Sequence, residues 1–411
     1  MTRKVLSIII ALILIGVVVG VIIISDFNDN YSDFVPLTSV SGIVESSNDF
    51  AFNIYKELST GNDNVFFSPY SITTALGMAY EGARGQTAQE MAEVLGIPED
   101  DQTRWDLMWS YQGYFNHGSR YYDLSTANAY WLAEDADLRE QYRTVLESYY
   151  WAHGEELDFA GDPEGSAETI NDWVEDKTNN KIENMIDPNS IVPYTYLMLT
   201  NAIYFKSDWK YKFDPRQTCE DIFILSDGTE LQTDMMYMPN DYETEFNCSH
   251  NSETRMLELP YKNGELAMYI LLPFYDVEIG TLEQNLTQQY ISELKGNMTL
   301  GTMDIKIPKF KFELNYNLNQ ALINLGMPTA FSTDADFTGI TDSTSLYINN
   351  VEHQSFVEVN EEGTEAAAAT VVSMMMCAGN MFFANHPFIF FIEHKDTGQI
   401  LFMGKLENPQ G

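Results

Sequence analysis

The segment that most constrains this chain lies near its C-terminus, where a charged turn leads into a long stretch without charges. Between Glu365 and Glu393 there is no Lys, Arg, Asp or Glu, although the chain carries 61 acidic and 22 basic residues. Four consecutive alanines at 366–369 would by themselves favour a helix. Thr370 and the two valines that follow it favour a strand. An uncharged run of this length is either core or a loop that becomes buried later.

The spacing within the run favours the loop that becomes buried. The positions that alternate along one face of an extended chain are all small or β-branched: Thr364, Ala366, Ala368, Thr370 and Val372. Such a face could enter a sheet without overpacking it. The alternative is an ordinary alanine-rich helix that starts at Gly363.

The composition indicates one large globular domain and excludes two classes of partner. Of the 411 residues 45% are hydrophobic, and no interior linker rich in Pro, Gly or Ser divides them. The formal net charge of −39 argues against nucleic acid and against a heparin-type polyanion, since both require a basic patch. An acidic, well-solvated surface is the expected consequence.

The three cysteines, Cys219, Cys248 and Cys377, are too few and too scattered for a disulfide framework. At most one bridge can form, and the sequence leaves open whether Cys219 pairs with Cys248. The fold must therefore be held by its hydrophobic core.

No enzymatic motif is present in the sequence. There is no G-x-S-x-G, no H-E-x-x-H, no phosphate-binding loop and no pair of cysteines with zinc spacing, and the six histidines include no i,i+4 pair. We therefore expect no catalytic residue, no cofactor and no metal.

The N-terminus has the pattern of an export segment. Residues 1–4 contain Arg3 and Lys4, and residues 5–24 contain no charge, which is long enough for a membrane helix. We favour a transmembrane anchor with residues 1–4 in the cytoplasm, and a cleaved signal peptide is the alternative. Residues 25–47 are polar and are expected to form a tether to a domain over 48–411.

Within that domain helical patterns come first and strand patterns second, which favours an α+β fold. Helices are expected at 48–58, 70–80, 87–95 and 170–186. Strand-like segments are expected at 64–67, 194–204, 256–272, 300–312, 382–391 and 400–406.

Five segments of the chain, taken in sequence order, resemble the corresponding segments of one protein family. They are NVFFSPYSITTALGMAYEGARG at 64–85, INDWVEDKTNNKIENMI at 170–186, TNAIYFKSDWKYKF at 200–213, EGTEAAAAT at 362–370, and NHPFIFFI at 385–392 with the strand pair that ends at Pro409. The segments are similar to those of inhibitory serpins and cover nearly everything from about residue 45 onward. The resemblance implies a serpin fold, with helices packed on three β-sheets and an exposed reactive-centre loop at about 361–385.

The resemblance also implies a function. Inhibitory serpins are suicide inhibitors: a protease cleaves the loop, and the cleaved loop inserts into the central sheet while the protease is still bound as an acyl-enzyme. We expect an inhibitor of an extracellular serine or cysteine endopeptidase, a monomer presented outside the cell on the membrane segment. A non-inhibitory serpin that acts as a binding protein is the alternative.

Individual residues follow from the same resemblance. The loop hinge comprises Glu362, Gly363, Thr364, Glu365, Ala366, Ala367, Ala368, Ala369 and Thr370. Ser68, Ser71, Asn201 and His353 fall on the shutter, where strands of the sheet part, and Trp209 falls on the breach, where the loop enters. The family's spacing places the reactive bond at Cys377–Ala378, with Met376–Cys377 as the alternative. These apolar residues suit a chymotrypsin-, elastase-, subtilisin- or papain-like protease.

Overall fold

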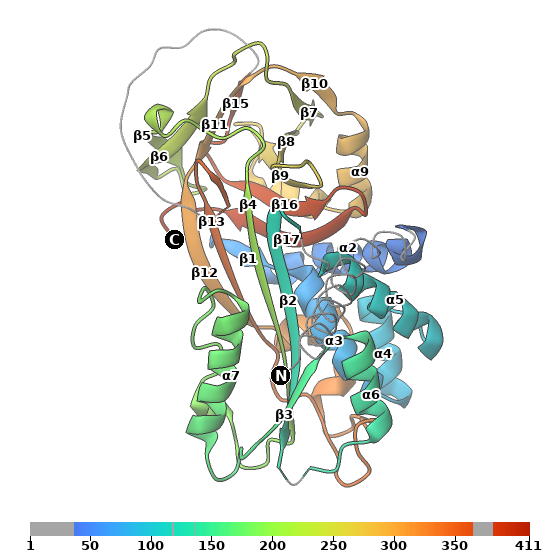
Figure 1. Ribbon diagram of the computed structural model, residues 1–411. Helices are drawn as coiled ribbons and strands as arrows, with labels where there is room; N and C mark the ends of the chain where they lie inside the picture. Colours follow the sequence, from blue (N-terminus) through green and yellow to red (C-terminus); the bar gives the residue numbers. More distant parts are fainter. Residues whose placement is uncertain (1–36, 117–118, 135, 365–380) are drawn as a thin grey trace, which may run out of the picture.

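The computed structural model describes residues 37–116, 119–134, 136–364 and 381–411 (Figure 1). Helices dominate the first half of this part and strands the second, which is the expected α+β organisation. The helices are α2 (Leu37–Leu58), α3 (Pro69–Gly82), α4 (Gly85–Leu95), α5 (Asp101–Phe115), α6 (Glu140–Tyr149), α7 (Pro163–Lys177), α8 (Ile279–Asn285), α9 (Gln288–Gly296) and α10 (Asn319–Leu325).

The strands form three sheets. The six-stranded sheet has the order β12 (Phe310–Asn317), β13 (Glu352–Val359), β14 (Gly363–Thr364), β4 (Leu197–Asp208), β2 (Tyr122–Ala133) and β3 (His153–Leu157). The seven-stranded sheet has the order β1 (Val65–Phe67), β17 (Gln399–Leu406), β16 (Phe388–His394), β9 (Leu266–Pro273), β8 (Thr254–Pro260), β7 (Phe246–His250) and β10 (Thr299–Gly301). The four-stranded sheet has the order β15 (Met381–Phe383), β11 (Asp304–Pro308), β6 (Glu230–Met238) and β5 (Cys219–Ile224).

The main core lies between the six-stranded sheet, the seven-stranded sheet and the helices α2 and α3. All residues of β16 and β17 are buried, which is why this part of the sequence is so apolar. A second, smaller core lies on the other face of the six-stranded sheet, where α7 covers β2 and β4 (Figure 1). Trp131 of β2 and Ile170 of α7 are fully buried there. The six-stranded sheet therefore has helices on both faces.

The local sequence explains where helix α3 begins and how closely it packs beneath the six-stranded sheet. Ser68 caps it by accepting a hydrogen bond from the Ser71 backbone N–H, and Pro69 follows as the first helical residue. Gly77 permits a close approach, because a Cβ atom there would lie 3.1 Å from the Tyr150 ring. The helix is buried on nearly all sides and contacts both β4 and β17.

Several element boundaries differ from the predictions. Helix α2 begins at Leu37, inside the segment expected to be a tether, because Ile43 and Val44 are buried against the core and extend the apolar face backward. Helix α7 ends at Lys177 rather than at Ile186, and Asn179 and Asn180 adopt positive φ angles of 52° and 57° that a helix cannot continue.

One part of the predicted fold class requires correction. The prediction included a transmembrane helix over residues 5–24, but none of the helices in the described part of the chain is long and apolar enough to cross a membrane. Residues 5–24 themselves lie outside the described residues. The fold class is therefore corrected to the α+β domain alone.

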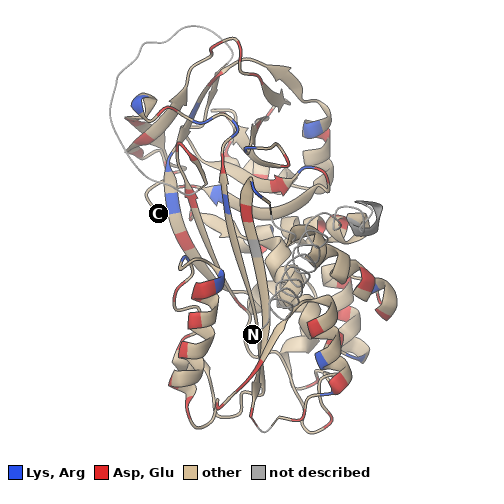
Figure 2. Cartoon of the chain, in the orientation of Figure 1, with Lys and Arg blue, Asp and Glu red and all other residues tan. Residues whose placement is uncertain are grey.

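The charged residues are spread widely over this domain. Figure 2 shows Asp and Glu on the outer faces of the helices and in the loops, with Lys and Arg far sparser. This distribution agrees with the acidic surface expected from a net charge of −39.

Candidate functional site

The predicted hinge begins as a strand of the six-stranded sheet. Gly363 pairs with Asp208 and Thr364 with Ser207 of β4, while Thr364 also pairs with Val359 of β13. A Cβ atom on Gly363 would lie 2.0 Å from the Ser207 carbonyl oxygen, so only glycine fits this close approach. Two residues of the hinge are thus already held between β13 and β4.

Strand β14 is much shorter than the two strands that flank it, β13 and β4. In residues 37–364 and 381–411, apart from the gaps given above, the two strands are connected only through β14, at Gly363 and Thr364. Strand β4 has 12 residues and β13 has 8, whereas β14 has 2. Most of the length of both strands therefore faces a position that β14 does not occupy.

Thr364 is buried, and its hydroxyl lies 2.8 Å from the hydroxyl of Tyr261. Tyr261 is itself fully buried and stacks on Trp209, with ring centroids 4.6 Å apart. This contact with a buried tyrosine shows that the side chain of Thr364 points into the core. The sequence did not indicate Tyr261, which lies 103 residues before Thr364.

Trp209 lies at the point where the hinge enters the sheet. Its backbone N–H donates to the Glu362 carbonyl at 2.8 Å, and its indole Nε1–H donates to the Asn360 carbonyl at 2.9 Å. Trp209 is 2% exposed. The residue predicted to lie at the breach therefore contacts the turn that precedes Gly363.

Two ion pairs hold that turn. The buried Glu361 carboxylate lies 3.1 Å from Lys309 Nζ and accepts a hydrogen bond from the Thr218 hydroxyl at 2.7 Å. Glu362 forms an ion pair with Lys212 on the surface. The sequence predicted neither lysine, since both pairs depend on how distant strands are arranged.

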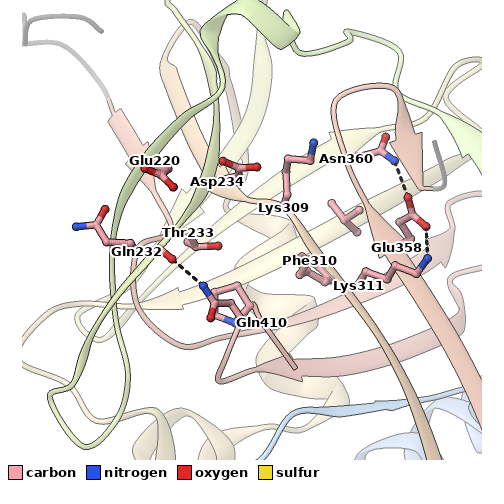
Figure 3. Close-up of a pocket in the computed structure, with 12 residues that line it drawn as sticks. Glu220, Gln232, Thr233, Asp234, Lys309, Phe310, Lys311, Glu358, Asn360 and Gln410 are labelled. Carbon is pink, nitrogen blue, oxygen red and sulfur yellow. Dashed lines mark hydrogen bonds and ion pairs between the residues drawn. The ribbon is translucent and has the colours of Figure 1, made fainter. Parts of the chain in front are cut away.

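A cavity of about 410 Å³ lies beside this turn (Figure 3). Its walls come from β5, β6, β12, β13 and the C-terminus, and Lys311 of β12 forms an ion pair with Glu358 of the neighbouring β13 on one wall. The lining carries both signs of charge and only a few apolar side chains. Small-molecule sites are mostly apolar with a few polar groups, so this cavity does not have their character.

The four predicted shutter residues lie near one another beneath the sheet. The Ser68 backbone N–H donates to His353 Nε2 at 3.0 Å, and the Ser68 hydroxyl donates to the Leu401 carbonyl at 2.7 Å. The Ser71 hydroxyl donates to the Asn201 side-chain oxygen. His353 lies on β13 and Asn201 on β4, so α3 connects the two strands that flank β14.

The network continues to a residue that the sequence did not indicate. The Asn201 amide donates to the side-chain oxygen of Asn128 on β2, whose own amide donates to the Tyr150 carbonyl at 2.6 Å. All three side chains are buried. A single asparagine in a strand gives no local signal, because its role depends on its partner across the sheet.

Burial lowers the pKa of His353 from its ordinary value of 6.5 to about 4. The imidazole is therefore neutral at pH 7, which leaves Nε2 able to accept the hydrogen bond from Ser68. His353 is a structural hydrogen-bond acceptor in this arrangement.

The described chain resumes at β15, which pairs in parallel with β11, Asp304 opposite Met381. Nine of the predicted hinge and reactive-bond residues lie outside the described residues: Glu365, Ala366, Ala367, Ala368, Ala369 and Thr370 of the hinge, and Met376, Cys377 and Ala378 of the reactive bond. Their roles stay predictions.

Two further predictions concern cysteines and metals. Cys219 and Cys248 are both free thiols, so the possible bridge between them is not formed. In the part of the chain that the structure describes, no group of His, Cys, Asp and Glu could hold a metal ion.

Comparison with known proteins decides the family. The model of the family Serpin (serine protease inhibitor) matches residues 45–409. The chain is a serpin. An uncharacterized serpin-like protein of Thermococcus kodakarensis is 41% identical over 90% of this chain and 86% of its own length. Serpin B6 of Pongo abelii is 39% identical over 89% of this serpin and 99% of its own length.

A solved structure extends the comparison to three dimensions. A cleaved ovalbumin mutant in its loop-inserted form superimposes with a TM-score of 0.81 at 27% identity, covering 90% of this serpin and all of that chain. The serpin fold predicted from the five segments is thus confirmed. Family membership also agrees with the expectation that the chain is an inhibitor-type protein and not an enzyme.

Proposed function

We propose that this serpin inhibits a serine or cysteine endopeptidase by inserting its cleaved reactive loop into the six-stranded sheet. One observation carries the proposal: Gly363 and Thr364 already form the first two residues of a strand between β13 and β4. The flanking strands extend well beyond them, and a strand that continued would add main-chain hydrogen bonds on both sides.

If β14 were extended in the register of Thr364, each further loop residue would lie opposite one residue of β4 and one of β13. Two residues beyond Thr364, Ala366 would lie between Phe205 and Val357. Six residues beyond it, Thr370 would lie between Asn201 and His353, at the shutter. The inward face would carry only small or β-branched side chains, so the strand could enter without displacing the core.

The protease supplies the catalytic groups that cleave the reactive bond. Its nucleophile attacks the carbonyl carbon of Cys377, the peptide bond to Ala378 breaks, and the amine of Ala378 leaves with a proton from the protease. The new bond is an ester for a serine protease and a thioester for a cysteine protease. About ten additional ladder hydrogen bonds at about 1 kcal/mol each would make insertion effectively irreversible before water hydrolyses that bond.

The loop sequence defines the class of target. No Lys, Arg or Asp lies between Glu365 and Glu393, which disfavours trypsin-like proteases and caspases. Methionines at 374–376 and Cys377 suit proteases with an apolar primary pocket, such as chymotrypsin-, elastase-, subtilisin- or papain-like enzymes. An extracellular target stays a prediction from the N-terminal sequence.

The proposal is tested by mixing the chain with subtilisin and with chymotrypsin. A covalent complex that survives denaturing electrophoresis is expected, and mass spectrometry of its peptides should place the cut at Cys377–Ala378 or Met376–Cys377. A cleaved chain beside fully active protease, for every apolar-specific enzyme tried, would overturn inhibition and favour a binding protein.

A matched pair of hinge variants gives the control. Thr364→Arg places a charge where the side chain must be buried, so it should slow insertion and convert the inhibitor into a substrate. Thr364→Ser keeps the hydroxyl near Tyr261 and should retain a stoichiometry close to that of the wild type. Equal stoichiometries for the two variants would contradict insertion through this position.

A further inference from the structure

Two exposed tyrosines flank β15, the strand with which the described chain resumes at Met381. Tyr242, in the segment between β6 and β7, is 82% exposed, and Tyr275, between β9 and α8, is 66% exposed. A single exposed aromatic side chain needs no explanation. Tyrosine is, however, among the residues enriched in protein interfaces, so two of them beside one strand indicate a contact surface.

The segment that carries Tyr242 is attached to the strands that hold Met381. The Asn240 backbone N–H donates to the Asp304 carboxylate at 3.1 Å, and Asp304 pairs with Met381 in the parallel ladder of β11 and β15. In Figure 1 the segment between β6 and β7 lies at the same end of the molecule as β15. Tyr242 is therefore presented beside the point where the described chain resumes.

Hydrogen bonds hold the turn that presents Tyr242. Its φ angle is 62°, which is rare for a bulky residue. Its backbone N–H donates to the Asn240 side-chain oxygen at 2.9 Å. The Asp241 carboxylate accepts from the backbone N–H groups of Glu243 and Thr244 at 2.9 and 2.7 Å. Because the turn is already held in this conformation, a partner that binds the tyrosine has little ordering entropy to overcome.

Tyr275 is attached to the residues that follow β15. Its hydroxyl donates to the Asn385 side-chain oxygen at 2.6 Å, and its ring centre lies 4.7 Å from that of His386. Met381 and Asn385 are four residues apart in the sequence, which is at most about 14 Å of chain. The two tyrosines thus lie toward opposite ends of one short strand.

The covalent chain keeps the proposed reactive bond close to this strand. Ala378 precedes Met381 by three residues, so their Cα atoms are at most about 11 Å apart whatever path the chain takes. A protease domain of about 250 residues has a radius of gyration of about 18 Å. A protease that holds the reactive bond in its cleft therefore also lies over the surface around β15.

The charge around the tyrosines specifies the partner further. Residues 217–254 and 263–294, which contain the two tyrosines, include no Lys or Arg. Glu243 follows Tyr242, Asp276 follows Tyr275, and both carboxylates belong to exposed residues. A surface of this sign accelerates association with a cationic partner and slows association with an anionic one.

We infer that Tyr242 and Tyr275 form a second contact surface for the target protease, beside the reactive loop, and that this surface selects proteases whose cleft has a basic rim. The inference rests on the proposed function, because the reactive bond determines which molecule lies over these residues. The loop sequence by itself selects only an apolar primary pocket, which many proteases share. The two tyrosines narrow the target among them.

The test measures docking separately from trapping. Chymotrypsin and subtilisin whose catalytic serine is replaced by alanine cannot cleave the loop, so their dissociation constants report the contact alone. Tyr242→Ser and Tyr275→Ser should each raise the dissociation constant for at least one of these proteases by about fivefold or more. With the active protease they should slow covalent-complex formation by a similar factor. The stoichiometry of inhibition should not change, because the hinge at Gly363 and Thr364 is unaltered.

Tyr194→Ser is the matched control. Tyr194 is 78% exposed, but it precedes β4 by three residues, at the end of that strand opposite to β14. This variant should bind both proteases as the wild type does. Tyr275→Phe keeps the ring and removes the hydroxyl, so it should retain most of the affinity, and it provides a reading if Tyr275→Ser alters the fold.

Charge reversal tests the chemistry of the partner. Between about 0.02 M and about 0.5 M salt the Debye length falls from about 20 Å to about 4 Å, so binding of the wild type should weaken. Glu243→Lys with Asp276→Lys should remove most of this salt dependence. Glu168→Lys with Asp172→Lys makes the same change in net charge at exposed positions on α7 and should leave the salt dependence in place. Equal effects of the two double variants would contradict a local surface.

The outcomes separate this inference from the proposed function. Wild-type affinity in both serine variants, in a chain that still forms covalent complexes, would overturn the contact surface and leave inhibition intact. Docking that depends on the tyrosines, in a chain that is then cleaved without trapping the protease, would overturn inhibition and leave the contact surface intact. If no protease binds the wild type, both fail.

Discussion

Lys309 and Glu361 form an ion pair, with Nζ 3.1 Å from Oε2, at the turn that leads into the hinge. The side chain of Glu361 is 3% exposed and that of Lys309 is 21% exposed, so the pair is largely removed from water. Lys309 immediately precedes β12, and Glu361 lies in the turn between β13 and β14, so their contact attaches this turn to the neighbouring edge of the six-stranded sheet.

The ion pair predicts a charge-reversal effect. Glu361→Lys would place a second cation beside Lys309 and remove the acceptor of the Thr218 hydroxyl, so it should lower the free energy of unfolding by about 3 kcal/mol or more. Urea denaturation measures this. The double variant Glu361→Lys with Lys309→Glu should recover part of the loss, and strictly additive effects would argue against the pair.

A second ion pair supplies the control. Glu358 lies 3.3 Å from Lys311, whose side chain is 63% exposed. Glu358→Lys should therefore cost less than about 1 kcal/mol in the same assay. Equal losses at Glu358 and Glu361 would show that burial is not what makes the pair at the hinge important.

The register of β14 predicts that neighbouring alanines in the loop are not equivalent. Continued by four residues, it places Ala368 on the inward face, between Ile203 and Ser355, and Ala367 on the outward face. Ala368→Asp should bury an unpaired carboxylate and convert the inhibitor into a substrate, whereas Ala367→Asp should have a much smaller effect. The stoichiometry of inhibition measures both, and the reverse order would contradict this register.

The buried imidazole of His353 predicts a dependence of stability on pH. Its pKa of about 4 lies below the ordinary value of 6.5, so between these values the unfolded chain binds a proton that the folded chain does not. The contribution is complete above pH 6.5 and is lost as the pH falls to 4, a total of about 3 kcal/mol.

Replacement of the imidazole isolates this contribution. His353→Gln should show a shallower decline in the free energy of unfolding between pH 6.5 and 4 than the wild type. His153→Gln, at an exposed position on β3, serves as the control and should follow the wild type. Parallel curves for wild type and His353→Gln would contradict the assignment.

The sequence predicted those features that depend on local pattern. Ser68 followed by Pro69 marked the start of a helix, as the structure shows. The strand with a small inward face that the alternation from Thr364 indicates stays a prediction beyond Thr364. Both depend on neighbours within a few residues. The family resemblance supplied His353, Asn201 and Trp209, which local pattern alone could not have linked.

The sequence could not predict contacts that depend on strand order. Tyr261 beneath Thr364, Asn128 beside Asn201 and Lys309 beside Glu361 are each separated by 52 residues or more from their partners. The predicted start of the first helix was wrong for a related reason. Helix α2 extends back to Leu37 because Ile43 and Val44 pack into a core that forms only in the folded chain.

The central claim is that the cleaved loop becomes a strand of the six-stranded sheet, and the melting temperature before and after one cut in the loop tests it most directly. The chain is cut in the loop by a small amount of a protease that it does not trap, and a single cleavage is verified by mass. About ten new ladder hydrogen bonds should raise the melting temperature by roughly 20 °C or more. A cut chain that melts at or below the temperature of the intact chain would contradict insertion.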